Sequence, residues 1–333
     1  MKILTIGAGA WGLALSNVLS ENFNEVFVYS RNEKIIEEIN NFHTSNKYLP
    51  SIILNNKIIA TSNFDLINEM DYLLIAVPSK AIKDVIEIVS EKLHKKIKII
   101  NATKGLEYTT NARIQEYIST HLSSDKIENM CSILGPGFAL EVCKHNLTCL
   151  NSVSANFEFA KEVQTLFSNE YFRVYVGQDV IGSEYGTSIK NAIAIASGII
   201  KGLGYDENTK AALITRGLAE MTRFGIHKGA KKDTFFGLTG VGDLVLTCNS
   251  TESRNFTFGY KVGKENDARK VINENKTTVE GLNTIKVVHN VSKADKIEMP
   301  IIDALYQILF EYKPIKETIL TLMTRPLKVE SFD

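Results

Sequence analysis

The 333-residue sequence predicts an α/β protein in which an N-terminal doubly wound parallel sheet is followed by a C-terminal all-helical part. Three observations support this prediction. A glycine-rich turn joins a short apolar run to a helical segment at the start of the chain. Further apolar runs alternate with amphipathic segments as far as about residue 177, and beyond residue 179 only helical patterns and glycine turns occur. We therefore expect one domain over residues 1–182 and a second over residues 183–333.

The glycine-rich turn has the order of elements that a dinucleotide-binding turn requires. Lys2–Ile6 is typical of a buried strand, and the helical segment Leu13–Ser20 follows the glycines. Gly7 provides the tight turn, Gly9 has no side chain to block a pyrophosphate, and Gly12 allows the helix to pack close to the strand. The N-terminus of the helix offers unpaired N–H groups to the phosphate charge. The segment thus predicts a Rossmann-like cofactor domain.

The next elements continue the α/β pattern. Glu25–Tyr29 is the second strand, at the distance that a βαβ unit needs, and this argues against a secretory signal peptide at the N-terminus. Glu33–Asn40 is predicted as a helix because its three isoleucines share one face. The polar segment 43–50 is expected to be a loop, and Lys57–Thr61 a strand.

The second half of the sheet is predicted from longer apolar runs. Asp71–Val77 is continuously hydrophobic, which indicates burial on both faces of a parallel sheet, and Ala81–Leu93 is an amphipathic helix. Asn156 is expected to be the N-cap of a helix over Phe157–Phe167. The remaining predicted strands are Lys96–Asn101, Cys131–Leu134, Thr148–Ser154 and Phe172–Val176.

Composition excludes several classes of partner. Lysines plus arginines equal aspartates plus glutamates at 38 each, so no overall charge would attract nucleic acid or an anionic membrane. The longest apolar stretch, residues 192–200, is too short to span a bilayer, so no membrane insertion is expected. The four cysteines lack metal-ligand spacing and are expected to be reduced thiols in the cytoplasm, with no metal site.

The end of the second strand bears on the choice of dinucleotide. A carboxylate there would bind the ribose 2′-hydroxyl of NAD, but the sequence is Tyr29-Ser30-Arg31-Asn32, with no acid before Glu33. Arg31 could stack on adenine or pair with a 2′-phosphate, or it could be a solvated surface charge. This favours NADP slightly over NAD.

Polar groups follow two later strands of the predicted sheet. Lys104 comes after the strand that ends at Asn101, and Gly135-Pro136-Gly137-Phe138-Ala139 comes after the next. Ligands bind at the carboxyl ends of parallel strands, so these groups are candidates for contact with an anion. The glycine-proline segment, considered alone, is equally well explained as a simple turn from strand to helix.

Lys190 lies in the middle of a helix of small and apolar residues, predicted over Ser183–Lys201. Gly186 and Ala194 lie on the same face, so Lys190 is difficult to explain as a surface lysine, although its amine could still reach water. The alternative is that Lys190 acts as a general acid and base. Burial, or a nearby cation such as Lys104, would bring the pKa of the Lys190 amine toward neutrality.

Two further polar groups occur in the helical part. Asp243 follows a glycine-rich segment that no strand precedes, so this segment is not a second nucleotide turn. Asp243 could cap the helix that it opens, bind a substrate hydroxyl or orient Lys190. Ser253-Arg254-Asn255 offers a hydroxyl, a guanidinium and an amide, a set suited to a phosphate dianion, although such a set is more often a solvated turn.

Together these motifs resemble the bacterial NAD(P)-dependent sn-glycerol-3-phosphate dehydrogenases over essentially the whole chain. The resemblance rests on the segments already described and on three others. Those three are Ala212-Leu213-Ile214-Thr215-Arg216-Gly217-Leu218, Thr103-Lys104-Gly105-Leu106-Glu107 and Val279-Glu280-Gly281. It implies reversible reduction of dihydroxyacetone phosphate, a small phosphorylated substrate, to sn-glycerol 3-phosphate, which supplies glycerophospholipid synthesis. A homodimer would be usual for the family.

The resemblance also implies roles for individual residues. Lys190 would donate the proton to the carbonyl oxygen in reduction. The substrate positions are Lys104, Gly135, Gly137, Lys190, Asp243, Thr247, Ser253, Arg254 and Asn255. The cofactor positions, besides Gly7, Gly9 and Gly12, are Ala10, Trp11, Arg31, Lys104, Ala139, Arg254, Val279 and Glu280. Relatives usually carry hydroxyl residues at positions 137 and 10, and a glycine at position 205, where this chain has Tyr205.

Two other functions fit parts of the sequence. A reductase of the same two-domain design that acts on a 3-hydroxy acid or a keto acid would share the cofactor domain, but would prefer a carboxylate to a phosphate. A regulator that senses the dinucleotide would bind the cofactor without turnover, and would leave the placement of Lys190 and Asp243 unexplained.

Overall fold

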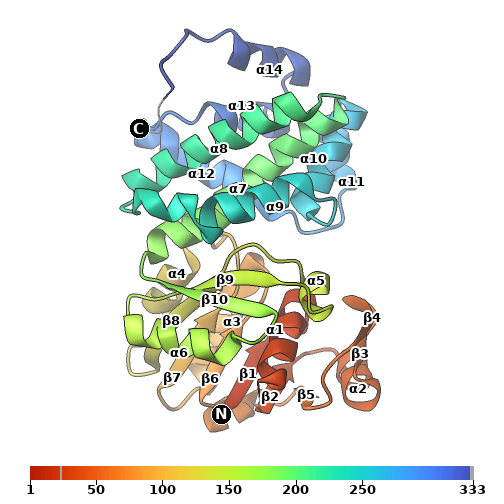
Figure 1. The fold of residues 1–333 in the computed structure, drawn as a ribbon, viewed down its shortest axis with the longest axis vertical. Helices are drawn as coiled ribbons and strands as arrows, with labels where there is room; N and C mark the ends of the chain where they lie inside the picture. The colour runs from red at the N-terminus through yellow and green to blue at the C-terminus, as the bar shows by residue number, and fades with distance from the viewer. Residues whose placement is uncertain (23–24, 331–333) are drawn as a thin grey trace. The chain divides into compact units, whose positions relative to one another are not determined.

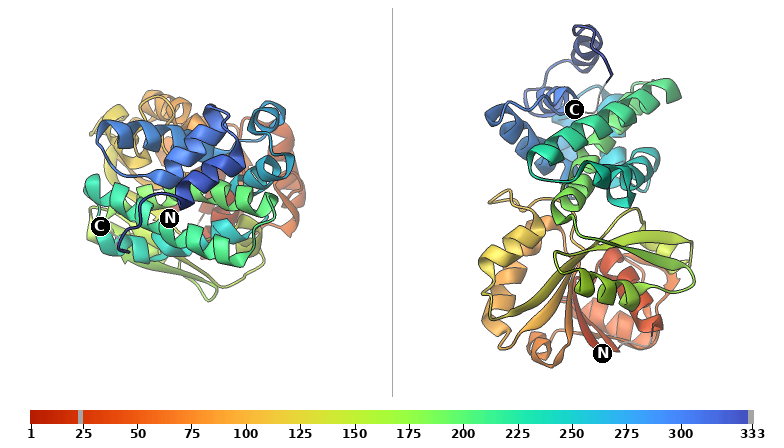
Figure 2. Two further views of the ribbon diagram at one scale, coloured as in Figure 1. Left: turned by 90° about the horizontal axis from the view of Figure 1, so that it is seen from above. Right: turned by 60° about the vertical axis from the view of Figure 1, so that its left-hand side comes forward.

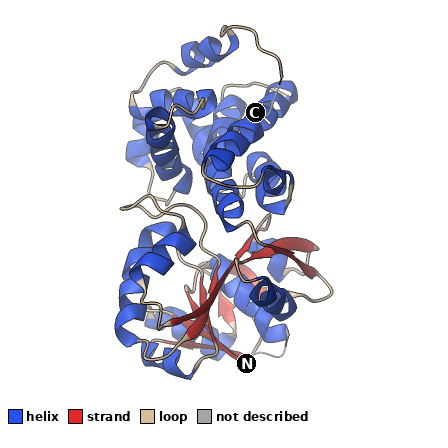
Figure 3. Cartoon of the chain, turned by 90° about the vertical axis from the view of Figure 1, so that its left-hand side faces the viewer, coloured by secondary structure: helices blue, strands red, loops and turns tan. Residues whose placement is uncertain are grey.

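The computed structural model describes residues 1–22 and 25–330, and the chain divides into two compact units, Met1–Val180 and Ile181–Asp333. Within the described residues all strands belong to the first unit, and the second unit is helical (Figures 1 and 3). The boundary between the units lies near the start of the long helix α7, Val180–Gly202. The α/β class and the change to an all-helical second part are therefore confirmed.

The first unit contains an eight-stranded sheet, a two-stranded ribbon and helices on both faces of the sheet. Its strands are β1 (Lys2–Ile6), β2 (Glu25–Tyr29), β3 (Thr44–Ser45), β4 (Leu49–Ile53), β5 (Ile58–Thr61), β6 (Tyr72–Ile75), β7 (Ile97–Asn101), β8 (Ile127–Leu134), β9 (Thr148–Val153) and β10 (Phe172–Gly177). Its helices are α1 (Ala10–Glu21), α2 (Glu33–Phe42), η1 (Phe64–Glu69), η2 (Ser79–Ala81), α3 (Ile82–Lys92), α4 (Ile114–His121), α5 (Ala139–Cys143) and α6 (Phe157–Phe167).

The order of strands in the large sheet places a switch point beside β1. The order is β10-β9-β8-β7-β6-β1-β2-β5, so the chain leaves β1 toward β2 on one side and later returns to β6 on the other. Both neighbours run parallel to β1, with Ile3 paired to Val26 and to Tyr72. In doubly wound sheets a ligand binds at the carboxyl ends of the strands that flank such a point.

One neighbouring pair of strands in the large sheet differs in direction from the others. β8 and β9 are antiparallel, with Ser132 opposite Val153, whereas β9 and β10 are parallel to each other. The connection from β8 to β9 carries the five-residue helix α5, whereas a parallel step needs a full crossover, usually through a longer helix. The doubly wound sheet is therefore parallel except for this one step.

Helices cover both faces of the sheet (Figure 2). The side chains of α1, α2 and α6 pack with one face, and those of η1, α3 and α4 pack with the other. All four residues of β6 are buried, as its continuous hydrophobicity predicted. Asn156 caps α6 as expected, because its side chain accepts hydrogen bonds from the N–H groups of Glu158 and Phe159.

The polar segment 43–50 is not a simple loop. Thr44–Ser45 and Leu49–Ile53 form the antiparallel strands β3 and β4. The Glu38 carboxylate accepts from the Asn46 backbone N–H at 2.7 Å and from the Thr44 hydroxyl at 3.1 Å, which holds the turn on α2. Leu49 and Ile52 are buried against the sheet, so two apolar side chains anchor an otherwise polar segment.

The second unit packs around α7, in which nearly every residue from Gly182 to Ile200 is buried. The other elements are α8 (Glu207–His227), η3 (Lys232–Phe236), η4 (Leu238–Gly242), α9 (Asp243–Asn249), α10 (Arg254–Glu265), α11 (Ala268–Glu274), α12 (Glu280–Ala294), α13 (Pro300–Phe310) and α14 (Ile315–Met323). Among the described residues no helix combines the length and hydrophobicity that a bilayer crossing needs.

Glycines allow α7 and α10 to approach each other closely. A Cβ added at Gly198 would lie 2.1 Å from the Phe256 carbonyl oxygen, and one added at Gly259 would lie 2.1 Å from the Ile195 carbonyl oxygen. The two backbones are therefore nearly in contact. This crossing holds the start of α10, with Ser253, Arg254 and Asn255, near the middle of α7.

Candidate active site

The turn between β1 and α1 has the shape that a dinucleotide requires. Gly7 has φ +123°, and a Cβ there would lie 2.4 Å from the Ala76 carbonyl oxygen at the end of β6. A Cβ at Gly12 would lie 2.0 Å from the Gly7 carbonyl oxygen, so the helix packs directly on the turn. Above Gly9, by contrast, nothing lies within 4 Å of the position that a Cβ would take. Open space at this position, beside the N-terminus of α1, is what the close approach of a pyrophosphate requires.

The next two residues, Ala10 and Trp11, form the first turn of α1. Gly9 is the N-cap and makes no side-chain capping bond, so the N–H groups of this turn are available to a ligand. Arg31 is exposed directly after β2 and forms no ion pair with the described residues. Asn32 caps α2, and the acid Glu33 belongs to that helix. No carboxylate therefore stands directly at the end of β2.

Lys104 and the glycine-proline segment lie together in the first unit. The Lys104 amine donates a hydrogen bond to the Gly135 carbonyl oxygen at 2.8 Å. Gly135 has φ +139°, and a Cβ there would lie 3.0 Å from Leu150 Cδ2. Ala139 is the first residue of the short helix α5. The structure thus brings Lys104, Gly135 and Gly137 to one place.

Lys190 is buried in the middle of α7, with 5% of its surface exposed. Its amine lies 2.5 Å from Asp243 Oδ1 and 2.7 Å from Thr247 Oγ1. The Thr247 hydroxyl in turn donates to the Asp243 carbonyl oxygen at 2.6 Å. A buried ammonium needs a counter-charge and satisfied hydrogen bonds, and Asp243 and Thr247 provide both. The alternative that Lys190 reaches out to water is wrong.

Asp243 does not cap its own helix. Gly242 is the N-cap of α9, no side-chain capping bond forms there, and Asp243 is the first helical residue. The preceding segment, Leu238–Gly242, is a π-helical turn, a distortion that often occurs at functional sites. The capping hypothesis was therefore wrong, whereas the interpretation that Asp243 orients Lys190 agrees with the salt bridge.

Ser253, Arg254 and Asn255 are not a solvated turn. Ser253 caps α10 by accepting from the Phe256 N–H at 3.2 Å, and Asn255 is buried, while Arg254 is exposed. The Asn255 amide donates to Asn191 Oδ1 at 3.0 Å and accepts from the Gly281 N–H at 2.9 Å. The sequence did not indicate this bridge from α7 to the start of α12.

The predicted residues thus form two groups, one in each unit. The first unit holds Gly7, Gly9, Ala10, Trp11, Gly12, Arg31, Lys104, Gly135, Gly137 and Ala139. The second holds Lys190, Asp243, Thr247, Ser253, Arg254, Asn255, Val279 and Glu280. Val279 is the N-cap of α12 and Glu280 its first residue, beside the Asn255 bridge. No group of acids, histidines and cysteines suited to a metal occurs among the described residues.

A Rossmann-type cofactor unit followed by a helical unit with a buried lysine–aspartate pair defines a class of NAD(P)-dependent oxidoreductases. Within this class the chain belongs to the NAD-dependent glycerol-3-phosphate dehydrogenase family. The family model for the N-terminus of NAD-dependent glycerol-3-phosphate dehydrogenase matches residues 2–160, and the model for its C-terminus matches residues 179–320.

Individual relatives agree with this assignment. The chain is 42% identical over 330 residues to "Glycerol-3-phosphate dehydrogenase [NAD(P)+]" of Staphylococcus aureus (strain USA300), with 99% of each chain covered. It is 40% identical over 334 residues to the protein of the same name from Limosilactobacillus reuteri (strain DSM 20016), again with 99% of each covered. The crystal structure of glycerol-3-phosphate dehydrogenase from Coxiella burnetii is 34% identical, with a TM-score of 0.90, and the match covers 97% of this chain and 99% of that one.

More distant structures share the fold alone. A D-mandelate dehydrogenase is 13% identical with a TM-score of 0.62, covering 94% of this chain and 98% of that one. This architecture therefore also occurs in enzymes with other names, and the choice of substrate must be argued from the site.

Proposed function

We propose that the chain interconverts dihydroxyacetone phosphate and sn-glycerol 3-phosphate with NADPH or NADH, and so supplies glycerol 3-phosphate for glycerophospholipid synthesis. The observation that carries the proposal is the buried Lys190 amine, held by Asp243 and Thr247. In this proposal residues 1–182 form the cofactor-binding domain, from which Lys104, Gly135 and Gly137 also contact the substrate. Residues 183–333 form the substrate and catalytic domain. Relatives of about 40% identity that bear the dehydrogenase name support the choice of reaction.

When bound, the cofactor supplies a hydride to the ketone carbon. Lys190 donates a proton to the carbonyl oxygen as charge develops there, and accepts it in the reverse direction. The Asp243 carboxylate, 2.5 Å from the amine, fixes its position and stabilises its positive charge before the transfer. Thr247 accepts from the same amine and thereby limits the directions in which it can donate.

The phosphate of the substrate serves as a remote handle. Arg254 is exposed at the start of α10 and offers a guanidinium, whereas Ser253 and Asn255 beside it are buried. Ser253 Oγ accepts from a backbone N–H, which leaves its hydroxyl proton for a phosphate oxygen. In the first unit, Lys104 and the backbone N–H groups of Gly135 and Gly137 are proposed substrate contacts. Binding energy from the phosphate would position the carbonyl for reaction.

Cofactor choice is proposed to favour NADP slightly over NAD. Two observations support this choice: Arg31 is exposed directly after β2, and no carboxylate follows β2 directly. Ala10, Trp11, Ala139, Arg254, Val279 and Glu280 are the further proposed cofactor contacts.

We further propose that the protein is a cytoplasmic homodimer. Leu320 and Met323 of α14 are 62% and 77% exposed, and apolar side chains on one helix suit contact with a second copy. Sedimentation equilibrium at micromolar concentration tests this proposal, and a monomer would contradict it.

The reaction is tested by following the absorbance of NADPH, and separately of NADH, with dihydroxyacetone phosphate present or absent. We expect loss of absorbance only when the phosphorylated ketone is present. Turnover of a keto acid instead would indicate the reductase alternative, and cofactor binding without any turnover would indicate a sensor.

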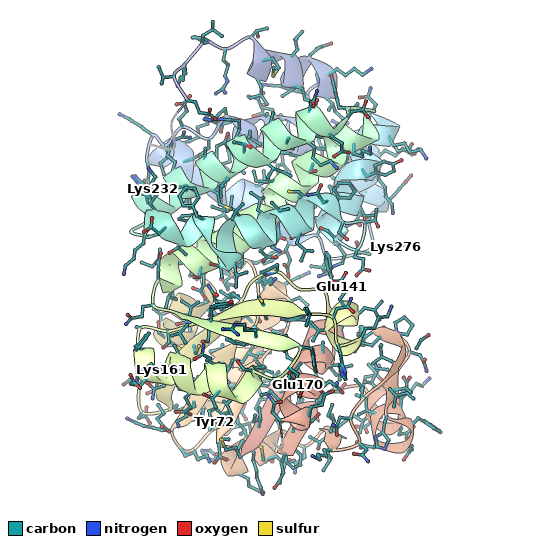
Figure 4. All side chains as sticks on the ribbon, viewed as in Figure 1. Tyr72, Glu141, Lys161, Glu170, Lys232 and Lys276 are labelled. Carbon is teal, nitrogen blue, oxygen red and sulfur yellow. The ribbon has the colours of Figure 1, made fainter. Side chains whose placement is uncertain are left out.

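The role of the amine is tested by Lys190→Ala. We expect its kcat to fall by about 10²–10⁴-fold, the usual contribution of a positioned acid or base. The matched control is Lys161→Ala on α6, a lysine whose side chain is 48% exposed (labelled in Figure 4). A kcat of Lys190→Ala near that of the control would exclude Lys190 as the proton donor.

A further inference from the structure

Trp11 is the single tryptophan of the 333-residue chain, and it lies in the first turn of α1, directly after the dinucleotide turn. Its ring packs against the core on one face of the sheet. The indole Nε1 is buried and has no hydrogen-bond partner among the described residues. A buried donor without a partner is unusual, so the position of the ring needs another explanation.

The ring is in close contact with the segment that follows β8. A Cβ built at Gly137 would lie 3.1 Å from Trp11 Cη2 and 3.4 Å from Trp11 Cζ3. These are the outer atoms of the six-membered ring. The indole therefore occupies part of the space that a side chain at position 137 would need, and Gly137 permits this contact.

The face of the same ring lies near a cation. Lys104 Nζ is 5.7 Å from the centroid of the Trp11 ring, within the range of a cation–π interaction. The same amine donates to the Gly135 carbonyl oxygen at 2.8 Å. Trp11 thus has three neighbours. Its backbone follows the turn between β1 and α1, the edge of its ring contacts Gly137, and the face of its ring lies near Lys104.

We propose that Trp11 is a positioning residue whose indole packs on Gly137 and holds Lys104 against Gly135. Through these contacts it couples the turn between β1 and α1, which is proposed to bind the cofactor, to residues 135–137, which are proposed to bind the substrate. This inference rests on the proposed function, because that function assigns Lys104 and Gly135 to the substrate. Lysine side chains have four rotatable bonds and lose their geometry easily. The face of the Trp11 ring restricts the Lys104 amine to positions from which it reaches the Gly135 carbonyl oxygen.

The consequence is that the fit between Trp11 and Gly137 controls the affinity for substrate. A methyl group at position 137 would force the indole to move by a few tenths of an ångström, and Lys104 would lose its support. Phenylalanine at position 11 lacks the outer ring atoms that such a methyl group would meet. The effect of Gly137→Ala should therefore depend on which residue occupies position 11.

A double-mutant cycle tests this dependence with Gly137→Ala, Trp11→Phe and the double variant. We expect Gly137→Ala to raise the KM for dihydroxyacetone phosphate by about tenfold, within the usual range of coupling between touching residues, while kcat changes by less than about twofold. In the Trp11→Phe background the same alanine should change KM by less than about twofold. Equal factors in both backgrounds would overturn the proposal.

The matched control is Gly177→Ala, in the same unit. A Cβ at Gly177 would lie 3.5 Å from Val153 Cγ2, an ordinary contact, so this variant should leave KM unchanged. If kcat and the melting temperature of Gly137→Ala fall while its KM stays constant, the contact is merely structural and the proposal is wrong.

Tryptophan fluorescence separates failure of this inference from failure of the proposed function. Trp11 is the only tryptophan, so the emission of the ligand-free protein reports the surroundings of this one ring. Gly137→Ala should shift that emission, and Gly177→Ala should not, whether or not the protein turns over dihydroxyacetone phosphate. Unchanged emission in Gly137→Ala would overturn the contact itself.

Discussion

Replacing Asp243 by asparagine removes one charge from the buried pair and keeps the shape of the side chain. The Lys190 amine lies 2.5 Å from Asp243 Oδ1, and the two side chains are 6% and 1% exposed. Water therefore cannot replace the lost counter-charge. Removing one partner of such a pair destabilises a protein by about 3–5 kcal/mol, whereas an exposed pair contributes about 0–1 kcal/mol. We expect Asp243→Asn to lower the free energy of unfolding by about 3–5 kcal/mol.

The measurement is urea unfolding at neutral pH, combined with kcat for the reduction of dihydroxyacetone phosphate. We expect kcat to fall by about 10²–10⁴-fold, because Lys190, the proposed proton donor, loses the group that positions it. The double variant Lys190→Met with Asp243→Asn removes both charges and keeps a similar volume. It should recover most of the lost stability and none of the activity, because an apolar replacement of a buried pair is often neutral or stabilising.

Two results would refute this reasoning. If the free energy of unfolding of Asp243→Asn lies within about 1 kcal/mol of the wild-type value, the pair is exposed to water, contrary to its burial in the structure. If the double variant is destabilised by the sum of the two single changes, the side chains act independently, which contact between them should prevent.

The remaining predictions concern the cofactor, the phosphate and a buried acid. Arg31→Ala should weaken NADPH more than NADH, by about tenfold, and equal Kd values for NADPH in variant and wild type would contradict its proposed contact with a 2′-phosphate. Arg254→Ala should raise the KM for dihydroxyacetone phosphate by about 10–100-fold through loss of a charge-assisted contact, and an unchanged KM would exclude Arg254 from the phosphate site. Burial raises the pKa of Glu220 to about 8, although its carboxylate accepts from the N–H groups of Ile301 and Ile302 at 2.6 and 3.2 Å. The folded state thus binds the proton more tightly than the unfolded state, so stability from Glu220 is complete below about pH 4.5 and is lost as the pH rises through about 8. Urea unfolding between about pH 5 and pH 8 should show a steeper fall for the wild type than for Glu220→Gln, and parallel slopes would show that Glu220 does not titrate in this way.

Features encoded by neighbouring residues were predictable from the sequence. The unbroken apolar run of β6 implied burial on both faces, and the glycine spacing after β1 implied the cofactor turn; both are seen. The cap of α6 followed from Asn156 alone. These signals are local, because side-chain periodicity and the demands of a helix terminus act over a few residues.

Features that depend on tertiary partners were not predictable. The antiparallel pairing of β8 with β9 depends on which sheet edge the chain reaches after α5, and no periodicity encodes that choice. The hairpin of β3 and β4 is too short for an alternating pattern to show, since β3 has two residues. Asp243 is of a residue type that often caps helices, so its local sequence suggested a cap. Its actual partner, Lys190, lies 53 positions away in the sequence.

Asn255, which is proposed to bind the substrate, also holds the helices of its own unit together. Its amide oxygen accepts from Gly281 N–H, and its amide nitrogen donates to Asn191 Oδ1, so both ends of the amide have fixed partners. Aspartate has the same shape but would put a carboxylate oxygen against the acceptor Asn191 Oδ1, so it would lose the hydrogen bond that Asn255 donates. One N–H of the amide remains for a ligand. Because Asn191 adjoins Lys190 and Gly281 adjoins Glu280, Asn255 sets the spacing between the proposed proton donor and a proposed cofactor contact. In the proposed substrate site, affinity would thus depend on this asparagine through the placement of α7 and α12 as well as through its remaining N–H.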